Sequence, residues 1–323
     1  MEPFGSPQPL NAMKIVFLDA FTLGQEIDLS PLHTLGDFVL YDRTAPDQLL
    51  ERAQNAEIIL TNKCEIRGDM LVHLPDLKYI GVTATGYNIV DVAAATARGI
   101  VVTNVRDYST AAVAQLVFAH ILQFTNDLAT YRSPEAWVNS PDWCYYHHSL
   151  TELAGKTMGI VGLGTIGKQV ARIALAFGMR VVTLPSERPR PEGIETLQVG
   201  HFWPACDFIS LHCPLNAETT HLIRAEVLRQ CKPTAILVNT ARGGLIQEED
   251  LAFALQSGWI GGAALDVLSV EPPPASHPLL SAPNCRLSPH IGWASLEARQ
   301  RLIKQVIANI EAFLAGSPIQ TVS

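Results

Sequence analysis

The stretch from Lys156 to Phe177 has the sequence Lys-Thr-Met-Gly-Ile-Val-Gly-Leu-Gly-Thr-Ile-Gly-Lys-Gln-Val-Ala-Arg-Ile-Ala-Leu-Ala-Phe. Its apolar run from Thr157 to Val161 predicts a buried strand. Apolar residues then recur at helical spacing, at Ile166, Val170, Ile173 and Phe177. The glycines between these two patterns, Gly162, Gly164 and Gly167, therefore have the strand–turn–helix context that a dinucleotide-binding G-x-G-x-x-G turn requires.

Each of the three glycines has its own physical role in such a turn. Gly162 permits the tight bend, Gly164 lets the backbone approach a pyrophosphate, and Gly167 lets the helix pack close to the strand. The first N–H groups of the helix face the anion. A glycine-rich turn without a ligand is the simpler alternative, but the strand and helix on either side favour dinucleotide binding.

Composition sets broad limits on the protein class. The chain has 323 residues, which is enough for two domains. Hydrophobic residues make up 48% and charged residues 17%, so a large buried core is available. The net charge of −8 argues against nucleic acid and acidic membranes as partners.

The six cysteines are scattered and include no C-x-x-C pair, which favours a reduced, cytoplasmic protein and gives no reason to expect a zinc site or another metal. The sequence contains no stretch of 18 uninterrupted apolar residues, so no transmembrane helix is expected. The N-terminus lacks the order of basic and then apolar residues that is typical of a signal peptide.

Strands and helices alternate at short spacing before the glycine turn. Residues 1–12 are rich in proline and predict a loose arm. Strands are expected at 14–18, 38–41, 57–60, 77–82 and 101–105, with helices at 46–53 and 90–97. This pattern predicts an open parallel α/β unit. A further helix is expected over 108–124.

Two groups in this first part follow predicted strands directly. Lys63 follows the third strand, and the loop of Thr83, Ala84, Thr85 and Gly86 follows the fourth. Ligands of open parallel sheets bind outside the carboxyl ends of the strands, and consecutive N–H groups of a loop can hold a carboxylate. The alternatives are a solvated lysine and an ordinary strand–helix connection.

The strand expected at 180–184 bears on the choice of cofactor. A domain that selects NAD usually ends this strand with a carboxylate for the ribose 2′-hydroxyl, but here Pro185 stands near that position. Ser186, Arg188 and Arg190 are suited to a 2′-phosphate instead. This favours NADP over NAD, although Glu187 lies close enough to keep NAD open.

Polar side chains follow the later predicted strands. Arg242 follows the strand at 235–238, Asp266 the strand at 261–265, and His290 the strand at 286–288. The carboxyl ends of parallel strands meet at one edge of a sheet, so these groups predict an active-site rim. Glu271 lies just beyond Asp266, before Pro272, Pro273 and Pro274.

These groups suit the reduction of a carbonyl. Addition of hydride creates an alkoxide that needs a proton, and histidine, with an ordinary pKa of about 6.5, is a natural donor. Glu271 would orient the ring of His290, and the planar fork of Arg242 would bind a carboxylate or the carbonyl oxygen. Each residue alone is more often structural, but together they indicate a 2-oxo acid as substrate.

The chain resembles the D-isomer-specific 2-hydroxyacid dehydrogenases over residues 13–318. The resemblance rests on five motifs: Leu153-Ala154-Gly155-Lys156-Thr157; His212-Cys213-Pro214-Leu215; Asn239-Thr240-Ala241-Arg242-Gly243-Gly244; Ala264-Leu265-Asp266-Val267 with Glu271-Pro272; and Ser288-Pro289-His290-Ile291-Gly292. Residues 82–88 and 141–146 look most like glycerate dehydrogenases, also called hydroxypyruvate reductases, although His147-His148 and the 185–190 loop depart from that pattern.

The resemblance implies roles for several of the site residues. Arg242, Glu271 and His290 would be the catalytic set, and the loop of Thr83, Ala84, Thr85 and Gly86 would bind the substrate carboxylate. Lys63, by its place at a strand end, is a further candidate for substrate binding. By the same match, the residues that would line the NADP or NAD site are Thr85, Thr165, Ile166, Cys213, Thr240, Asp266 and Gly292. The other expected cofactor contacts are the turn glycines Gly162, Gly164 and Gly167, then Ser186 and Arg188, and finally Pro214, Ala241 and His290. Asp266 would face the nicotinamide amide.

The resemblance also implies an architecture of two Rossmann-like α/β domains with open parallel sheets. A flavodoxin-like substrate domain would comprise residues 13–105 and 291–323, a NAD(P)-binding domain residues 106–290, and the active site would lie in the cleft between them. The helix at 295–314 would pack on the first domain. The family is typically dimeric, and the aromatic segment 131–150 would pack on a partner subunit or, alternatively, stack over the substrate.

The expected activity is NAD(P)H-dependent reduction of hydroxypyruvate to D-glycerate, and also of glyoxylate. The alternative is a nucleotide-sensing scaffold or corepressor-like binding protein on the same fold, because fold alone does not fix function. The presence of both His290 and Glu271 favours the enzyme.

Overall fold

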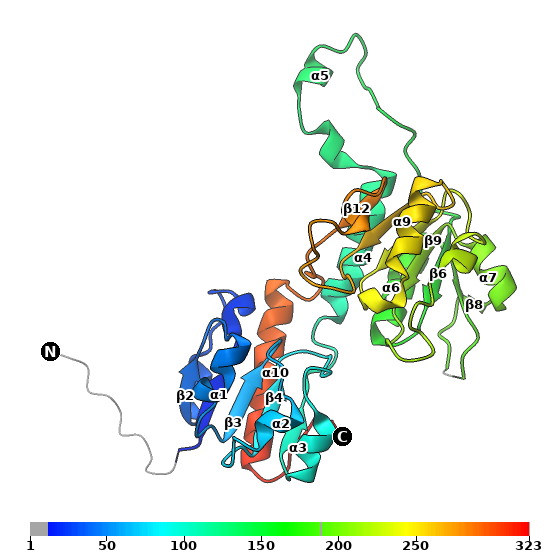
Figure 1. The fold of residues 1–323 in the computed structure, drawn as a ribbon. Coiled ribbons are helices and arrows are strands. Elements are labelled where there is room, and N and C mark those ends of the chain that lie inside the picture. Colours follow the sequence, from blue (N-terminus) through cyan, green and yellow to red (C-terminus); the bar gives the residue numbers. More distant parts are fainter. Residues whose placement is uncertain (1–11, 188, 323) are drawn as a thin grey trace. The chain divides into compact units, whose positions relative to one another are not determined.

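The structure, a computed structural model, describes residues 12–187 and 189–322. These residues form two compact units, which are coloured along the chain in Figure 1. The central unit is Thr110–Trp293, and the N-terminal unit consists of the described residues before and after it. The boundaries fall after residues 109 and 293, where the sequence suggested 105 and 290. The arm expected at residues 1–12 lies almost wholly outside the described residues.

The N-terminal unit is built on a five-stranded sheet in the order β2-β1-β3-β4-β5. Every pairing in it is parallel. The strands are β1 (Lys14–Phe17), β2 (Asp37–Leu40), β3 (Ile58–Thr61), β4 (Tyr79–Val82) and β5 (Val101–Thr103). This is the strand order of flavodoxin-like sheets, so the predicted fold of this part is confirmed.

The helices of this unit are short except the last. They are α1 (Leu49–Arg52), α2 (Gly68–Leu71), α3 (Val92–Ala97) and α10 (Leu296–Leu314), with 3-10 turns at Ala20–Leu23, Ser30–Thr34 and Pro46–Gln48. Ser295 begins α10 by accepting a hydrogen bond from the N–H of Ala298. At the other end of α10, the ring of Phe313 packs 4.8 Å from that of Tyr79 on β4, which fixes the helix on the sheet.

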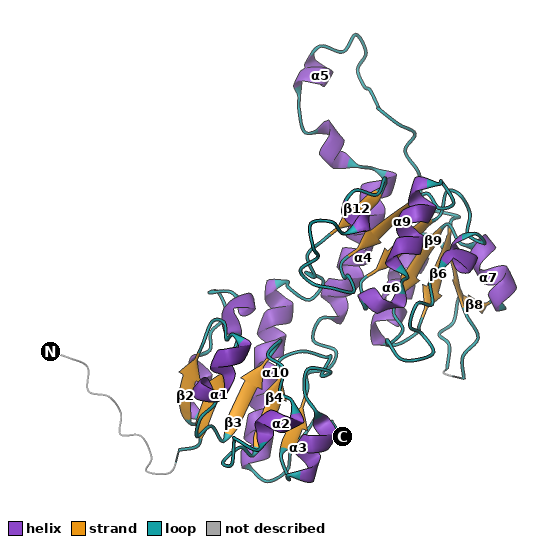
Figure 2. Ribbon diagram, in the orientation of Figure 1, coloured by secondary structure: helices purple, strands orange, loops and turns teal. Residues whose placement is uncertain are grey.

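The central unit is built on a seven-stranded parallel sheet in the order β12-β11-β10-β9-β6-β7-β8. The strands are β6 (Thr157–Val161), β7 (Arg180–Thr183), β8 (Ile194–Thr196), β9 (Phe208–Leu211), β10 (Ile236–Asn239), β11 (Gly262–Leu265) and β12 (Cys285–Leu287). Figure 2 shows these strands flanked by helices. The helices are α4 (Thr110–Thr125), α5 (Glu135–Val138), α6 (Thr165–Ala176), α7 (Val199–Ala205), α8 (Ala225–Leu228) and α9 (Glu248–Gln256), with 3-10 turns at Leu128–Tyr131, Gly243–Leu245 and Pro278–Leu280.

Several of these elements were not expected from the sequence. Strand β8 contains one buried residue, Ile194, and pairing with β7 rather than its own pattern makes it a strand. Helix α7 carries Pro204 in its interior, which argues against a helix locally. Helices α2 and α8 are single turns, and α9 shows the periodicity of a helix only over Leu251, Ala254 and Leu255.

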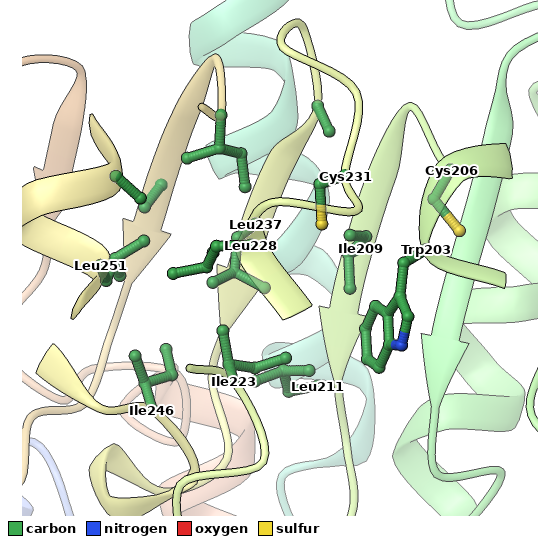
Figure 3. Close-up of a cluster of buried hydrophobic side chains, with 14 of the residues drawn as sticks. Trp203, Cys206, Ile209, Leu211, Ile223, Leu228, Cys231, Leu237, Ile246 and Leu251 are labelled. Carbon is green, nitrogen blue, oxygen red and sulfur yellow. The ribbon is translucent and has the colours of Figure 1, made fainter. Parts of the chain in front are cut away.

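Two hydrophobic layers cover the sheet of the central unit. Residues on α4 and α6 pack against one face, including Val117 and Val170. Residues on α7, α8 and α9 pack against the other, including Trp203, Leu228 and Leu251 (Figure 3). Successive strand residues serve opposite layers: Ile209 and Leu211 join the layer of Trp203, and Phe208 faces the other layer. Burial on both faces explains why the strands are continuous apolar runs.

The strand order of the central unit reverses at β6. From β6 the chain proceeds outward to β7 and β8, and it then returns to place β9 on the other side of β6. Ligands of open α/β sheets bind in the crevice at the carboxyl ends of the strands where this reversal occurs. The glycine turn after β6 and the segment after β9 border that crevice.

Candidate active site

The glycine turn has the geometry expected for a pyrophosphate site. Gly162 has a φ of +101°, and a Cβ there would lie 2.6 Å from the backbone nitrogen of Cys213 after β9. A Cβ on Gly167 would lie 2.1 Å from the carbonyl oxygen of Gly162, so neither position accepts a side chain. A Cβ on Gly164 would meet nothing within 4 Å. The open space is therefore beside Gly164, where α6 begins without a side-chain cap.

The end of β10 contains a buried polar atom that lacks a partner. Among the described residues, nothing hydrogen-bonds to the hydroxyl oxygen of Thr240. An unpaired buried polar group costs about 1–3 kcal/mol, so such an atom is expected where a bound molecule completes the hydrogen bonding. Thr240 and the space beside Gly164 are features that a bound dinucleotide would fill, and the residues present therefore fit such a cofactor.

Asn239 shapes the loop that carries Arg242. Its fully buried side chain accepts a hydrogen bond from the N–H of Ala241 at 3.0 Å and donates one to the carbonyl of Arg242 at 2.8 Å. The guanidinium of Arg242 is exposed and donates to the carbonyl of Ala241 at 2.6 Å. The sequence showed Asn239 only as part of a family motif and gave it no role, although asparagine at the end of a strand is a known signal for this kind of local turn.

Asp266 holds the loop that carries His290. The carboxylate of Asp266 accepts hydrogen bonds from the hydroxyl of Ser288 at 2.5 Å, from the N–H of Ile291 at 2.9 Å and from the N–H of Gly292 at 2.8 Å. His290 lies between these donors with a φ of +53°, in the left-handed region. Three bonds to a buried carboxylate offset the cost of that backbone conformation.

His290 and Glu271 form a short hydrogen bond. Nδ1 of His290 lies 2.6 Å from Oε2 of Glu271, and about a third of each side chain is exposed (33% and 31%). The other oxygen of Glu271 accepts the N–H of Leu268 at 3.0 Å, which fixes the carboxylate. Among the described residues of the central unit, none hydrogen-bonds to Nε2 of His290. The ring is thus oriented through one nitrogen while the other can meet a substrate.

Gly243 joins the Arg242 loop to the Glu271 loop. A Cβ at Gly243 would lie 2.0 Å from the carbonyl carbon of Leu268 and 2.2 Å from the nitrogen of Ser269. The two backbones touch, and any side chain at this position would separate them. The loop after β10 and the loop after β11 are therefore one packed structure.

Two neighbouring groups are held in their neutral forms. Desolvation of the ring lowers the pKa of His212, which follows β9, to about 4. Burial raises the pKa of the Cys213 thiol, so this cysteine beside the crevice remains a thiol at neutral pH. Neither residue has the properties of a nucleophile or general acid.

The loop after β7 contains no acidic residue at the strand end, where Thr183, Leu184 and Pro185 follow one another. Ser186, Glu187 and Arg190 are exposed, and Arg190 donates to the hydroxyl of Thr196. Arg188 lies outside the described residues.

The predicted substrate-binding residues lie in the N-terminal unit, after β3 and β4. The N–H groups of Asn62, Lys63 and Cys64 all donate to the carboxylate of Asp19, at 2.6–3.0 Å. These backbone N–H groups are therefore satisfied internally, and the side chain of Lys63 is exposed. Asp19 was not singled out from the sequence.

The loop after β4 differs from its neighbour. Thr83 is buried and its N–H donates to the carbonyl of Thr61. The hydroxyl of Thr85 donates to the carbonyl of Val105, and the side chain of Asn104 donates to the carbonyl of Thr85. Among the described residues, none accepts a hydrogen bond from the N–H groups of Ala84, Thr85 or Gly86. The loop is therefore held by the N–H of Thr83 and the oxygens of Thr85, and the N–H groups of Ala84, Thr85 and Gly86 can meet a ligand.

The described residues lack two other kinds of feature. No helix there has the length and apolar character needed to cross a membrane. No cluster of three or more histidine, cysteine, aspartate or glutamate side chains there could hold a metal ion.

Comparison with known proteins gives consistent matches. The family model described as "D-isomer specific 2-hydroxyacid dehydrogenase, NAD binding domain" matches residues 118–292. The chain is 38% identical over 321 residues to a hydroxypyruvate reductase of Blautia hydrogenotrophica, a match that covers 96% of this chain and 100% of that protein. It is 40% identical over 311 residues to a glycerate dehydrogenase of Methylorubrum extorquens, with 94% and 97% covered.

A similar solved structure is that of an acyclic imino acid reductase in complex with NADPH and D-Arg. It superposes with a TM-score of 0.84 at 30% sequence identity and covers 96% of this chain and 100% of its own.

Proposed function

The chain belongs to the D-isomer specific 2-hydroxyacid dehydrogenase family, and we propose that within it the protein reduces hydroxypyruvate to D-glycerate, and also reduces glyoxylate. Members of this family are NAD(P)-dependent oxidoreductases. The substrate proposal is supported by two relatives that match over nearly their whole length and are named for hydroxypyruvate and glycerate. The observation that carries the chemistry is the oriented ring of His290, with Nδ1 bonded to Glu271.

The proposed reaction assigns one role to each side chain. When bound, the reduced nicotinamide supplies the hydride that adds to the carbonyl carbon. Nε2 of His290 gives its proton to the carbonyl oxygen as charge develops there. Glu271 accepts from Nδ1 and stabilises the charged ring before the transfer. The product is the 2-hydroxy acid.

Substrate binding is proposed to involve both units. The exposed guanidinium of Arg242 has donors available for the carboxylate or the carbonyl oxygen. The open N–H groups of Ala84, Thr85 and Gly86, with Lys63, would hold the carboxylate.

NADP is the proposed preferred cofactor. Support comes from Pro185, whose side chain cannot accept a hydrogen bond from a ribose hydroxyl, and from the hydroxyl and guanidinium groups at Ser186, Arg188 and Arg190. The structurally similar imino acid reductase binds NADPH. Glu187 is the one feature of this loop that suits NAD.

A homodimer in the cytoplasm is the proposed state. The segment around α5 extends from the body of the central unit (Figure 1). It exposes large apolar side chains: Leu128 (77%), Val138 (80%), Trp143 (86%) and Tyr146 (71%). An apolar surface of this kind is typical of a subunit interface. All six cysteines are free thiols, which suits a reducing compartment.

Consumption of reduced cofactor is the decisive experiment. Hydroxypyruvate, glyoxylate and pyruvate would each be mixed with the protein and with NADH or NADPH, and loss of reduced nicotinamide followed by absorbance. We expect hydroxypyruvate with NADPH to give the highest kcat/KM. Higher kcat/KM with NADH would reverse the cofactor proposal, and activity confined to pyruvate would reverse the substrate proposal. Protein that binds cofactor but reduces none of them would favour the scaffold alternative.

A further inference from the structure

A second histidine–glutamate pair lies behind the Glu271 loop. Nε2 of His277 is 3.2 Å from Oε2 of Glu248, in the first turn of α9. Only 9% and 10% of these side chains are exposed. A carboxylate so far from water needs partners for both oxygens. The positions of those partners are informative.

The two oxygens of Glu248 bind opposite ends of one loop. Oε1 accepts a hydrogen bond from the N–H of Ser269 at 2.8 Å, and Oε2 faces the ring of His277. One side chain therefore closes the segment between residues 269 and 277. Glu271 lies inside this segment, two residues after Ser269.

His277 is itself fixed at both ring nitrogens. Its Nδ1 accepts the N–H of Leu279 at 3.4 Å, at the start of the 3-10 turn Pro278–Leu280. Because Nδ1 accepts a hydrogen bond, the hydrogen of the neutral ring is on Nε2, from which it is donated to Glu248. The N–H of His277 also donates to the carbonyl of Pro274 at 2.9 Å. The end of the loop is thereby held as firmly as its beginning.

The contact between His290 and Glu271 depends more on how the loop positions the Glu271 side chain than on the attraction between charges. His290 and Glu271 are each about a third exposed, so water screens the attraction between them. That attraction cannot by itself hold a 2.6 Å contact. A displacement of about 1 Å in a catalytic group can cost about 100-fold in rate. The N–H of Leu268 holds one oxygen of Glu271, and the buried side chain of Glu248 anchors the loop that carries Glu271.

We propose that Glu248 and His277 are positioning residues, which clamp the loop of residues 269–277 so that the carboxylate of Glu271 meets Nδ1 of His290. The clamp rests on the proposed function of the His290–Glu271 pair. Neither residue touches the reacting atoms. Their effect on turnover passes through Glu271 alone.

The test compares Glu248→Gln with Glu249→Gln. The two exchanges change the same charge at adjacent positions of α9, but Glu249 is exposed and accepts a hydrogen bond from the side chain of Gln247 at 3.0 Å. We expect Glu248→Gln to lower kcat by about 10-fold and to leave the KM for reduced cofactor unchanged. The control should stay within about twofold. Equal effects of the two exchanges would overturn the clamp.

A double-mutant cycle distinguishes positioning from general destabilisation. If Glu248 acts through Glu271, adding Glu248→Gln to Glu271→Gln produces no further loss of turnover. Losses that multiply would overturn the proposal. If Glu271→Gln alone leaves turnover unchanged, the proposed role of Glu271 fails, and that result is separate from any effect of Glu248.

His277→Gln is a second variant that tests the clamp, and we expect it to have a smaller effect than Glu248→Gln. It removes the ring between Glu248 and Leu279 and leaves the bond from Ser269 to Glu248 in place. We expect a loss of several-fold in kcat that again disappears in the Glu271→Gln background. If Glu248→Gln does not fold, this variant decides, and unchanged kcat in His277→Gln overturns the proposal.

Discussion

His290 and Glu271 meet at 2.6 Å with about a third of each side chain exposed, whereas His277 and Glu248 meet at 3.2 Å with about a tenth exposed. Both pairs belong to the central unit, and the loop after β11 contributes one member to each. The chemical groups are the same in the two pairs. The two pairs differ in their burial and in which of their polar atoms have a hydrogen-bond partner.

In the buried pair every polar atom has a partner. Glu248 accepts from Ser269, and the second ring nitrogen of His277 accepts from Leu279. In the exposed pair, no described residue of the central unit hydrogen-bonds to Nε2 of His290. The difference teaches that a histidine–carboxylate pair is suited to proton transfer only when one ring nitrogen is left free. A pair with every atom satisfied is suited to holding structure.

The largest expected effect comes from removing the exposed histidine. His290→Ala should lower kcat by at least about 100-fold, because the developing alkoxide loses its proton donor. The free energy of unfolding should change by less than about 0.5 kcal/mol, since the residue is partly exposed. Turnover and urea unfolding of the same preparation measure the two effects. Near-normal turnover would remove His290 from this role.

The buried histidine should show the opposite balance. His277→Ala leaves the buried carboxylate of Glu248 with one oxygen unpaired, which should cost about 2 kcal/mol of unfolding free energy. Urea denaturation with His290→Ala in parallel provides the comparison. If both variants lose the same stability, the contrast between the pairs is wrong.

Arg242 extends the comparison to a third exposed group. Arg242→Lys keeps the charge and removes the planar fork, so kcat/KM for the 2-oxo acid should fall by about 10-fold while the KM for reduced cofactor stays the same. Steady-state kinetics with each substrate varied in turn measure this. Unchanged kinetics would place Arg242 among the structural residues.

The smallest effect concerns a histidine that contacts a hydroxyl group. Nε2 of His212 lies 2.8 Å from the hydroxyl of Ser210, and desolvation lowers the pKa of His212 to about 4. Between about pH 6.5 and pH 4 the unfolded chain binds a proton that the folded chain does not. The free energy of unfolding should therefore fall as the pH is lowered through this range. Urea denaturation as a function of pH should show a shallower fall for His212→Gln, and an equal slope would contradict the assignment.

Much of the fold could be predicted from the sequence, because its signals are local. The strand, the turn and the helix around Gly162 are contiguous, so each glycine could be given a role before its neighbours in space were known. Both parallel sheets were also expected, because strand and helix patterns alternate along the chain. Strand β8 and helix α7 could not be found in this way. Pairing with β7 makes Ile194–Thr196 a strand, and packing of Phe202 and Trp203 on the sheet stabilises a helix that contains Pro204.

The candidate site also contains residues that could be predicted from the sequence and residues that could not. Arg242, Asp266 and His290 could be placed at strand ends from the sequence, and Glu271, just beyond Asp266, could be assigned as the carboxylate that orients His290. The neighbours that hold these groups were not visible. Glu248 lies 21 residues from Ser269 in sequence, and Asp19 lies 44 residues from Lys63, and no periodicity connects such pairs.

The sequence by itself determined the class of fold, the glycine turn between a strand and a helix, and the residue types at the strand ends, because these depend on neighbouring residues and on the direction of parallel strands. Only the tertiary structure decided which histidine–glutamate pair is buried and which is open, that the oxygens of Asp266 hold the His290 loop, and that Thr240 lacks a partner. The physical reason is that burial and hydrogen-bond satisfaction depend on distant segments packing together. This packing gives the two histidine–glutamate pairs different properties. His290 and Glu271 can exchange a proton, and His277 and Glu248 hold the loop.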